Sequence, residues 1–282
     1  MKELEGKRAV ITGAGSGLGR ALSLALTREG CRVGIADIDQ AGTAETLGMV
    51  EKAGGRGEAC PVDVTDPDSV KDMADRFERE WGGVDLLVNN AGIAVAGLVG
   101  DMPLEDWRRI VAVNLMGVVH GCHEFIPRMR KQGGGHIVNV ASFAGIGNLA
   151  EMAGYNVTKA AVISLSETLK MELAPQRIGV TVVCPLFFNT GLIDDLHSTD
   201  PFQEEFARAC FRCSRTSAEE VAAKVVEAVR RNRFYLIPQR SGKVFWALKR
   251  VSPPAFACVT ARLNRAGVGR PLLMWAARRG LL

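Results

Sequence analysis

The sequence predicts an α/β fold, a single doubly wound domain on a parallel sheet of mainly seven strands, with a helical C-terminal extension. Short runs rich in Val and Ile alternate with longer stretches of helical periodicity. This alternation is typical of parallel strands that helices cover on both faces. A glycine-rich turn, TGAGSGLG at 12-19, joins the first strand to the first helix. No repeat or low-complexity stretch interrupts residues 1-238, so we expect one domain there.

The elements follow in a regular order. The first strand, RAVITG, is a short apolar run that suits a strand buried on both faces. The expected strands cover residues 8-13, 32-37, 57-62, 84-88, 136-141, 178-184 and 234-238. Helices fill the intervals because apolar residues there recur on one face; they cover residues 18-29, 40-53, 67-80, 104-131, 153-174 and 218-231.

The composition is that of a globular protein. Of 282 residues, 47% are hydrophobic and 23% charged, which suffices for a sizeable core. Seven scattered cysteines do not suggest a disulfide framework, so we expect a reducing compartment and a cytoplasmic location. The lone CFRC at 210-213 has no second pair, and we expect no metal site. No secretory signal fits before the first strand, and no apolar run reaches the roughly 18 residues of a membrane span.

Charge is distributed unevenly along the chain. The net charge is +4, yet residues from 228 onward carry twelve Lys or Arg and no Asp or Glu. The first 227 residues carry 23 basic and 31 acidic side chains. We therefore divide the chain into an α/β domain, residues 1-240, and a basic extension, residues 241-282.

The extension combines basic residues with Leu, Val and Trp. We expect two or three short amphipathic helices, broken at Pro253-Pro254 and at Gly267-Gly269. Basic helices with Trp and Leu suit an anionic membrane surface, which would make the protein peripheral to a membrane. Packing of the extension on its own domain or on a partner subunit is the other interpretation. No nucleic-acid-binding module accompanies the charge, so nucleic acid is not an expected partner.

The glycine-rich turn predicts a dinucleotide site. The backbone of Gly13, Ser16, Gly17, Leu18 and Gly19 can turn tightly and come close to a pyrophosphate. The N-terminus of the following helix adds N–H groups and a partial positive charge.

Asp37 ends the second expected strand, where a carboxylate can accept hydrogen bonds from the adenosine ribose hydroxyls. It would also repel a 2′-phosphate. Neither Ser16 nor Ile38 supplies a cation for that phosphate. The sequence therefore predicts NAD, in preference to NADP, as the cofactor.

The segment YNVTK places Tyr155 and Lys159 four residues apart, on one face of a helix. A phenol has a pKa near 10, and a nearby ammonium favours its ionised form. The pair could therefore form a proton-transfer group. This short pattern is also common by chance, so an exposed helix face that happens to carry Tyr and Lys is the other interpretation until further motifs are considered.

Further motifs complete a pattern. They are Asp63 and Val64 after the third strand, NNAG with Asn90, Ala91 and Gly92, Asn114 in the long helix, and Ser142 after the fifth strand. With TGAGSGLG and YNVTK, they make residues 5-240 resemble the short-chain dehydrogenase/reductase family, whose fold is of the Rossmann type.

The resemblance implies roles for these residues. Tyr155 would be the general acid or base at the substrate oxygen, and Lys159 would lower its pKa and hold the nicotinamide ribose. Ser142 would bond the reacting oxygen, and Asn114 would hold a water that relays protons. Around the cofactor, Asp63 and Val64 would border the adenine, and the residues of NNAG would pack along it.

One motif departs from the family pattern. The family has P-G-x-x-x-T after the sixth strand, whereas this chain has PLFFNT, with Pro185 and Thr190 kept and Leu186 in place of the glycine. Thr190 could still bind the carboxamide. With Leu186 in that place, the family's backbone path and the shape of its pocket floor do not carry over to this chain without a structure.

The loops at the carboxyl ends of the strands predict the substrate. Their side chains are mostly apolar, with no Arg or Lys to hold a carboxylate or phosphate. We expect a bulky, uncharged alcohol or ketone of the steroid, retinoid, long-chain or aromatic kind. The expected pocket residues are Ala94, Phe143, Leu149, Met152, Leu186, Phe187 and Leu192.

The sequence thus predicts an NAD-dependent enzyme that interconverts a lipophilic secondary alcohol and its ketone, as a homodimer or homotetramer. One alternative is a 3-ketoacyl-thioester reductase, against which Asp37 argues, because such enzymes usually prefer NADP. Another is a non-catalytic NAD-binding scaffold or sensor at a membrane, against which the intact Ser142, Tyr155 and Lys159 argue.

Overall fold

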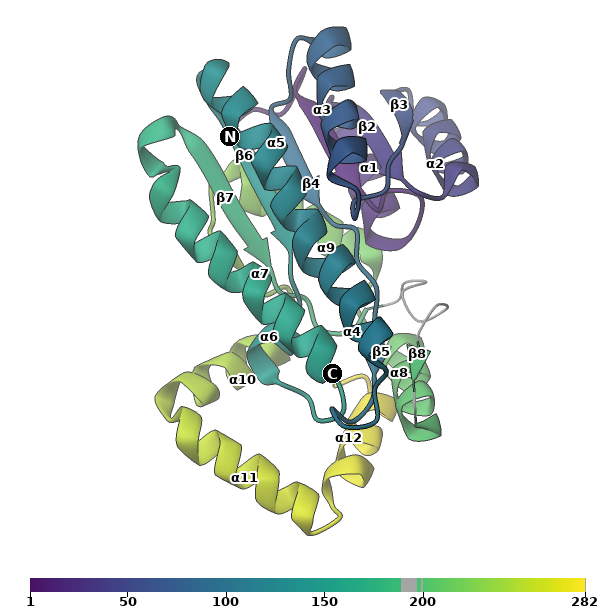
Figure 1. Cartoon of the computed structure of the whole chain (residues 1–282), viewed down its shortest axis with the longest axis vertical. Coiled ribbons are helices and arrows are strands. Elements are labelled where there is room, and N and C mark those ends of the chain that lie inside the picture. Colours follow the sequence, from purple (N-terminus) through teal and green to yellow (C-terminus); the bar gives the residue numbers. More distant parts are fainter. Residues whose placement is uncertain (189–196, 199, 282) are drawn as a thin grey trace.

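The structure, a computed structural model, describes residues 1–188, 197–198 and 200–281. Its centre is a seven-stranded sheet in the order β3-β2-β1-β4-β6-β7-β9, with every neighbouring pair parallel (Figure 1). The strands are β1 (Arg8–Thr12), β2 (Arg32–Asp37), β3 (Arg56–Pro61), β4 (Leu86–Asn89), β6 (Gly135–Val140), β7 (Ile178–Val183) and β9 (Tyr235–Leu236). The predicted α/β fold and its seven strands are confirmed, although the last strand is only two residues long.

Helices cover both faces of the sheet and form two cores. One core lies under α1 (Gly17–Arg28), α2 (Gln40–Lys52) and α9 (Ala218–Arg230). The other lies under α3 (Pro67–Trp81), α5 (Gly117–Lys131) and α7 (Ala153–Glu172), of which α5 and α7 stand in front in Figure 1. Val10 and Ile11, adjacent on β1, belong to opposite cores. Both faces are therefore apolar, which explains the continuous Val and Ile runs.

The chain order places a crevice at the centre of the sheet. From β1 the chain proceeds outward to β2 and β3, then crosses back to β4 on the other side of β1. Loops that leave β1 and β4 therefore diverge at the carboxyl ends of these strands. Such a switch point is where open parallel sheets bind ligands.

The helix expected over 104-131 is divided into three parts. They are α4 (Leu104–Val111), a π-helix, η1 (Ala112–Met116), and α5. A π-helical turn inserts an extra residue into the helical ladder and is frequent at functional sites. Here the turn carries the buried Asn114. The expectation of one uninterrupted helix was wrong, because amphipathic periodicity does not reveal a single wider turn.

The stretch Leu104–Lys131 is also long and apolar enough to cross a membrane, by length and composition alone. The sequence expectation, which looked for an unbroken apolar run, missed it. Of the apolar window, 39% is buried inside the fold, and Phe125 and Ile126 belong to the core. A core helix passes the same test, and we assign this stretch to the core.

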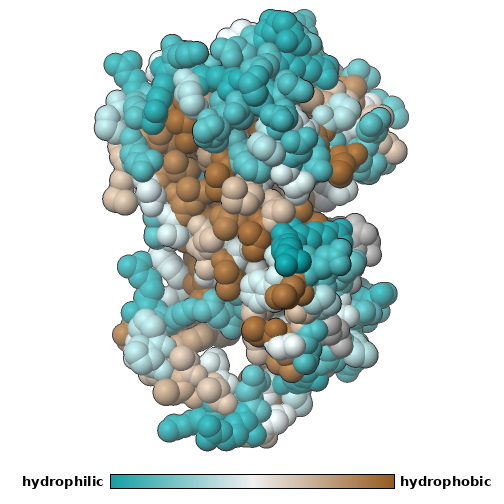
Figure 2. All heavy atoms as spheres, in the orientation of Figure 1, coloured by the Kyte–Doolittle hydropathy of each residue, from teal (hydrophilic) through white to brown (hydrophobic). Residues whose placement is uncertain are grey.

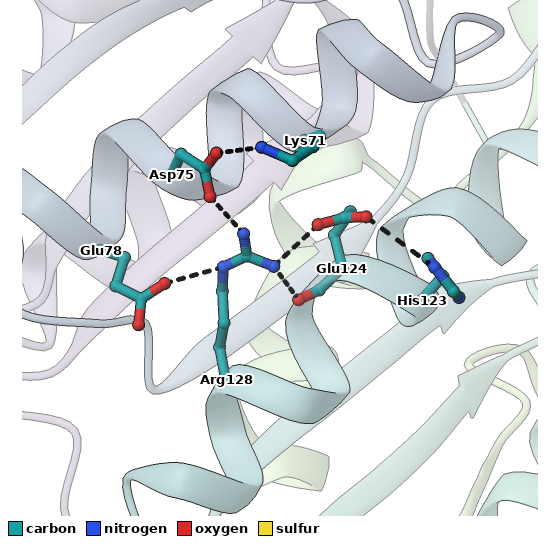
Figure 3. Close-up of polar contacts among 6 residues, drawn as sticks. All are labelled: Lys71, Asp75, Glu78, His123, Glu124 and Arg128. Atoms are coloured by element: carbon teal, nitrogen blue, oxygen red, sulfur yellow. Dashed lines mark hydrogen bonds and ion pairs between the residues drawn. The ribbon is translucent and has the colours of Figure 1, made fainter.

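An ion-pair cluster fixes α3 against α5 (Figure 3). Arg128 Nε donates to Glu78 Oε2 at 2.9 Å and its Nη1 to Glu124 Oε2 at 2.7 Å. Its Nη2 pairs with Asp75, which also pairs with Lys71. A network of this kind contributes more than isolated surface pairs do, and its role here is structural.

Several elements escaped the sequence prediction. They are α6 (Ala144–Gly147), the 3₁₀-helix η2 (Ala174–Gln176), α8 (Pro201–Cys213) and the two-stranded pair of β5 (Val95–Ala96) with β8 (His197–Ser198). The start of α8 had a sequence signal, since Asp200 caps the N–H of Phe202 and Pro201 stands at the first helical position.

The extension forms three helices, α10 (Arg240–Val251), α11 (Pro253–Arg265) and α12 (Gly269–Arg278), which end at the breaks predicted for them. They form an arch below the sheet domain in Figure 1. The arch packs on that domain at both ends. Trp246 lies 5.6 Å from Tyr235 between ring centroids, and Arg270 pairs with Glu151 at 2.8 Å. Of the two interpretations of the extension, packing on its own domain is therefore observed.

Candidate active site

Two close backbone approaches shape the turn between β1 and α1. Gly13 has a φ of +64°, and a Cβ on it would lie 2.7 Å from the Cα of Ala91. A Cβ on Gly19 would lie 2.0 Å from the carbonyl oxygen of Gly13. Ser16 precedes α1 and makes no capping hydrogen bond through its side chain. The first turn of α1 can therefore offer its N–H groups to an anion such as a phosphate.

Asn90 joins this turn to the loop after β4. Its Nδ2 donates to the carbonyl oxygens of Thr12 at 2.9 Å and Gly13 at 3.0 Å. The Thr12 hydroxyl in turn accepts from the N–H groups of Asn90 and Ala91. The two loops at the switch point are thereby held as one rigid unit.

Asp37 lies beside the glycine turn. One carboxylate oxygen accepts from the N–H of Gly15 at 2.9 Å, and the other accepts from the N–H of Asp39 at 3.0 Å. The neighbouring Ile38 is 70% exposed and carries no charge. This rim of the cleft is therefore anionic and suits a diol better than a phosphate.

These loops border a cleft of about 600 Å³ that extends from Asp37 to Tyr155. Its size and its donors fit a dinucleotide. The predicted cofactor residues that line it are Gly13, Ser16, Gly17, Leu18, Asp37, Ile38, Asp63, Val64, Asn90, Ala91, Gly92, Tyr155, Lys159 and Pro185. Gly19 instead packs beneath the turn, and Thr190 lies outside the described residues. Sequence reasoning missed Asp39, Ile93, Arg109, Val140 and Phe188, which also line the cleft.

Ser142, Tyr155 and Lys159 come together where the cleft meets the front of the sheet. Tyr155 and Lys159 lie on the first turns of α7 and are 9% and 3% exposed. Lys159 Nζ donates to the carbonyl oxygen of Val140 at 2.9 Å and lies 5.8 Å from the centroid of the Tyr155 ring. Ser142 follows β6 and accepts from the N–H of Ala144 through its Oγ.

Burial shifts the pKa values of Tyr155 and Lys159 in opposite directions. Burial raises the pKa of the Tyr155 hydroxyl, and a hydrogen bond with Ser142 opposes this rise. Burial also lowers the pKa of Lys159, to about 8. The Lys159 ammonium, 5.8 Å from the centroid of the Tyr155 ring, donates to the carbonyl oxygen of Val140. That Lys159 lowers the pKa of Tyr155 stays a prediction.

Asn114 clamps the segment that follows NNAG. Its Oδ1 accepts from the N–H of Ile93 at 2.8 Å, and its Nδ2 donates to the carbonyl oxygen of Ile93 at 2.9 Å. A carbon placed at the Cβ position of Gly92 would lie 3.2 Å from Asn114 Oδ1 and 3.3 Å from Lys159 Nζ. Asn114 and Lys159 therefore border the same small space, as a proton relay through a water would require.

Leu186 turns towards the extension. Its N–H donates to Gln239 Oε1 at 3.1 Å, and a Cβ on Gly242 would lie 2.2 Å from its Cδ1. Gly242 lies in the first turn of α10. Because it has no side chain, there is room for the side chain of Leu186, which stands where the family has a glycine. Leu186 is 8% exposed and couples the segment after β7 to the extension.

A second cavity, of about 670 Å³, opens beside Ser142 and Tyr155. Six predicted substrate residues line it, namely Ala94, Phe143, Leu149, Met152, Leu186 and Phe187; Leu192 lies outside the described residues. No Asp, Glu, Lys, Arg or His lines it within residues 1–188, 197–198 and 200–281. The same ranges hold no cluster of three or more His, Cys, Asp or Glu that could bind a metal ion.

Much of this cavity's wall was not predicted. α8 contributes Gln203 and Phe206, and the extension contributes residues from all three of its helices. In the sequence, the Leu and Trp residues of the extension predict a surface for membrane contact or for packing. Only the folded chain shows that part of this apolar surface faces the catalytic residues.

Comparisons with known proteins agree with this geometry. The family model for short chain dehydrogenases matches residues 7–201. The "Probable oxidoreductase EphD" of Mycobacterium tuberculosis is 36% identical over 263 residues, which are 90% of this chain and 44% of that protein. The chain thus spans less than half the length of that relative. The 3-oxoacyl-[acyl-carrier-protein] reductase FabG of Thermotoga maritima is 37% identical over 193 residues, which are 68% of this chain and 78% of that protein.

Among solved structures, a short chain dehydrogenase/reductase from Burkholderia phymatum in complex with NAD superposes with a TM-score of 0.85. It is 33% identical in sequence, and the match covers 89% of this chain and 95% of that one. The match of the family model to most of the chain, the parallel sheet and the grouping of Ser142, Tyr155 and Lys159 all agree. This chain belongs to the short-chain dehydrogenase/reductase family of oxidoreductases.

Proposed function

We propose that the protein is an NAD-dependent oxidoreductase that interconverts a lipophilic secondary alcohol and its ketone. The observation that carries this proposal is the meeting of two cavities at Tyr155. One is a dinucleotide-sized cleft with Asp37 at its rim, and the other is apolar and without a charged lining residue in the described part of the chain. The NAD in the Burkholderia phymatum relative supports the choice of cofactor.

When bound, NAD would supply a hydride acceptor at its nicotinamide. The residues of this chain would manage the oxygen and its proton. The Tyr155 phenolate, at the junction of the cavities, would take the proton from an alcohol, and the Tyr155 hydroxyl would give a proton to the oxygen of a ketone that is reduced. Ser142 would donate to the same oxygen and hold the charge that develops there. Lys159, in its protonated form, would favour the phenolate form of Tyr155. The space that Asn114 and Lys159 border would carry protons outward to the solvent.

A panel of neutral alcohols tests the proposal. Purified protein is expected to reduce NAD with hydrophobic secondary alcohols and to turn over small polar or carboxylated alcohols far more slowly. NADP should serve poorly. Equal rates with polar and apolar alcohols, or a preference for NADP, would contradict the proposal.

A 3-ketoacyl-thioester reductase is the second candidate, and the identity to the 3-oxoacyl-[acyl-carrier-protein] reductase FabG of Thermotoga maritima favours it. The basic surface of the extension could meet an acidic carrier protein. The anionic rim at Asp37 argues against the NADP that such enzymes usually prefer. Acetoacetyl thioesters with NADH, added to the same panel, decide between the two candidates.

Ser142→Ala should shift the pH dependence of alcohol oxidation. The hydrogen bond with Ser142 lowers the pKa of Tyr155, so its loss should raise that pKa. Oxidation needs the phenolate as base, and the rising limb of kcat/KM should therefore move to higher pH. At neutral pH we expect a loss of about 10²–10³, as for removal of a donor to a developing oxyanion. Ser142→Thr, which keeps the hydroxyl, is the control; a limb at unchanged pH in Ser142→Ala would contradict this role.

We also propose that the protein is a homodimer or homotetramer. Exposed apolar residues lie on the side of the molecule where α5 and α7 face the viewer, and Figure 2 shows a broad apolar area there. Met116, on η1 just before α5, is 39% exposed, and Val157, on α7, is 55% exposed. A second copy of the chain would cover this face. Sedimentation analysis at micromolar concentration tests this, and a monomer would rule it out.

For location, we propose a cytoplasmic protein with a membrane-facing arch. Val251 on α10 is 86% and Val259 on α11 54% exposed, and neither lines the cavity. Arg262 and Arg265 stand exposed on α11. Basic residues near anionic lipid are worth about 1 kcal/mol each.

Arg262→Glu with Arg265→Glu should therefore reduce co-sedimentation with anionic vesicles, by at least tenfold in the partition constant at low salt. Lys52→Glu with Arg56→Glu, the same charge change at exposed positions of the sheet domain, is the control. High salt should weaken binding of the wild type. Equal binding by the two double variants, or no binding by the wild type, would refute the membrane contact.

A further inference from the structure

The substrate cavity has two ends of different origin. At one end, Ser142 and Tyr155 of the sheet domain form the reacting centre, and Met152 lines the wall beside them. At the other end, Phe256 and Leu263 of α11 and Leu272 of α12 line the wall. In Figure 1, α11 forms the side of the arch that lies away from the sheet, and α12 returns from it to α8.

The described part of the chain covers α11 only partly. None of the residues of α11 is buried, although α11 lines the cavity with Phe256, Thr260 and Leu263. On α12, Leu272 is 47% and Trp275 48% exposed, and both line the same cavity. Figure 2 shows the lower part of the molecule hollowed beside the arch. A hydrocarbon in the cavity would cover these side chains and supply the missing contacts.

The arch is nevertheless held in place. Arg270, near the start of α12, pairs with Glu151 at 2.8 Å and with Asp200. Arg278, at the end of α12, pairs with Glu205 of α8 at 3.0 Å. On α10, Lys249 donates to the carbonyl oxygen of Ile146. Arg270, Arg278 and Lys249 thus help to hold the apolar side chains of the extension over the cavity. These three basic residues therefore have a role other than lipid contact.

We propose that α11 and α12 form a binding site for the distal hydrocarbon chain of the substrate. This inference rests on the proposed function and names its substrate class: an elongated, uncharged secondary alcohol or ketone. Its oxygen lies at Ser142 and Tyr155, and its chain runs under α10 to α11 and α12. Because the cavity lining described carries no charged side chain, the far end of the substrate is also neutral. A compact substrate would not reach α11 and α12 and would leave their apolar side chains exposed to water.

The test compares secondary alkanols from butan-2-ol to tetradecan-2-ol. In the wild type, kcat/KM should rise about fourfold for each methylene buried, until the chain fills the cavity. Leu272→Trp places a larger side chain in the distal end. It should lower the ratio of kcat/KM for dodecan-2-ol to that for butan-2-ol by at least tenfold. Leu263→Trp repeats the test on α11, in case the first variant folds poorly, and circular dichroism checks both.

Leu248→Trp is the matched control. Leu248 lies on α10, is 58% exposed and does not line the cavity, so this variant should keep the chain-length profile of the wild type. If both cavity variants retain that profile, or if the wild type shows no preference for long chains, the distal site is refuted.

A readout without turnover separates this inference from the proposed function. Titration calorimetry with the same alkanols should show affinity that rises with chain length and falls in Leu272→Trp. If long alkanols bind in this way but none is oxidised, the distal site stands and the proposed reaction fails. If alkanols are oxidised but neither affinity nor kcat/KM depends on Leu272 and Leu263, the reaction stands and the distal site fails.

Discussion

Tyr155→Phe is expected to abolish turnover of the best alcohol in the panel, by about 10³-fold or more, and to leave NAD affinity nearly unchanged. The substitution removes the hydroxyl at the junction of the two cavities but keeps the ring that packs among Ala94, Met102 and Ile110. General acid–base groups typically contribute 10²–10⁴ in rate. Steady-state kinetics and a cofactor titration by fluorescence measure the two effects separately.

Lys159→Ala is the informative comparison for Tyr155→Phe. It should lose both activity and cofactor affinity, because Lys159 borders the cofactor cleft as well as the Tyr155 ring. Lys159→Met, which keeps most of the side-chain volume in this 3% exposed site, separates loss of charge from loss of packing. Substantial activity in a purified, folded Tyr155→Phe protein would remove Tyr155 from the mechanism.

Asp37→Ala combined with Ile38→Arg is expected to shift the cofactor preference towards NADP. The double change removes the carboxylate that would repel a 2′-phosphate and adds a guanidinium at a 70% exposed position on the rim. Hydrogen bonds to charged groups are worth about 1.5–3 kcal/mol. The ratio of kcat/KM for NADP to that for NAD should therefore rise by at least about tenfold to a hundredfold.

The contacts of Asp37 refine this experiment. Asp37 also accepts from the N–H of Gly15, so Ala at this position loosens the glycine turn and should weaken binding of both cofactors. Asp37→Asn keeps an acceptor for Gly15 and removes only the charge. It should lower the preference for NAD with a smaller loss of overall affinity. A wild-type protein that already prefers NADP would show that the interpretation of Asp37 is wrong.

The wall of the substrate cavity illustrates the limit of sequence reasoning. Phe143, Met152 and Leu186 follow strands or start helices of the sheet domain, and their place near Tyr155 follows from the topology. Leu263 and Leu272 are more than a hundred residues from Tyr155 in the chain. Their amphipathic pattern was visible, but a pattern on a helix does not say which surface covers it. The apolar packing of Leu273 and Ala277 against α8 decides that, together with the ion pairs of Arg270 and Arg278, and these contacts form only in the folded chain.

Side-chain periodicity and glycine placement act locally, so the sequence was enough to predict the order of the seven main strands and of the helices between them. It also identified the dinucleotide turn and the Tyr155–Lys159 pair, since both depend on short spacings within one turn or helix. The widened turn at Asn114 and the surface that the basic extension covers can be seen in the folded chain alone. These depend on burial and on contacts between distant segments, and the loss of water around a charge or an apolar face is a property of the assembled fold.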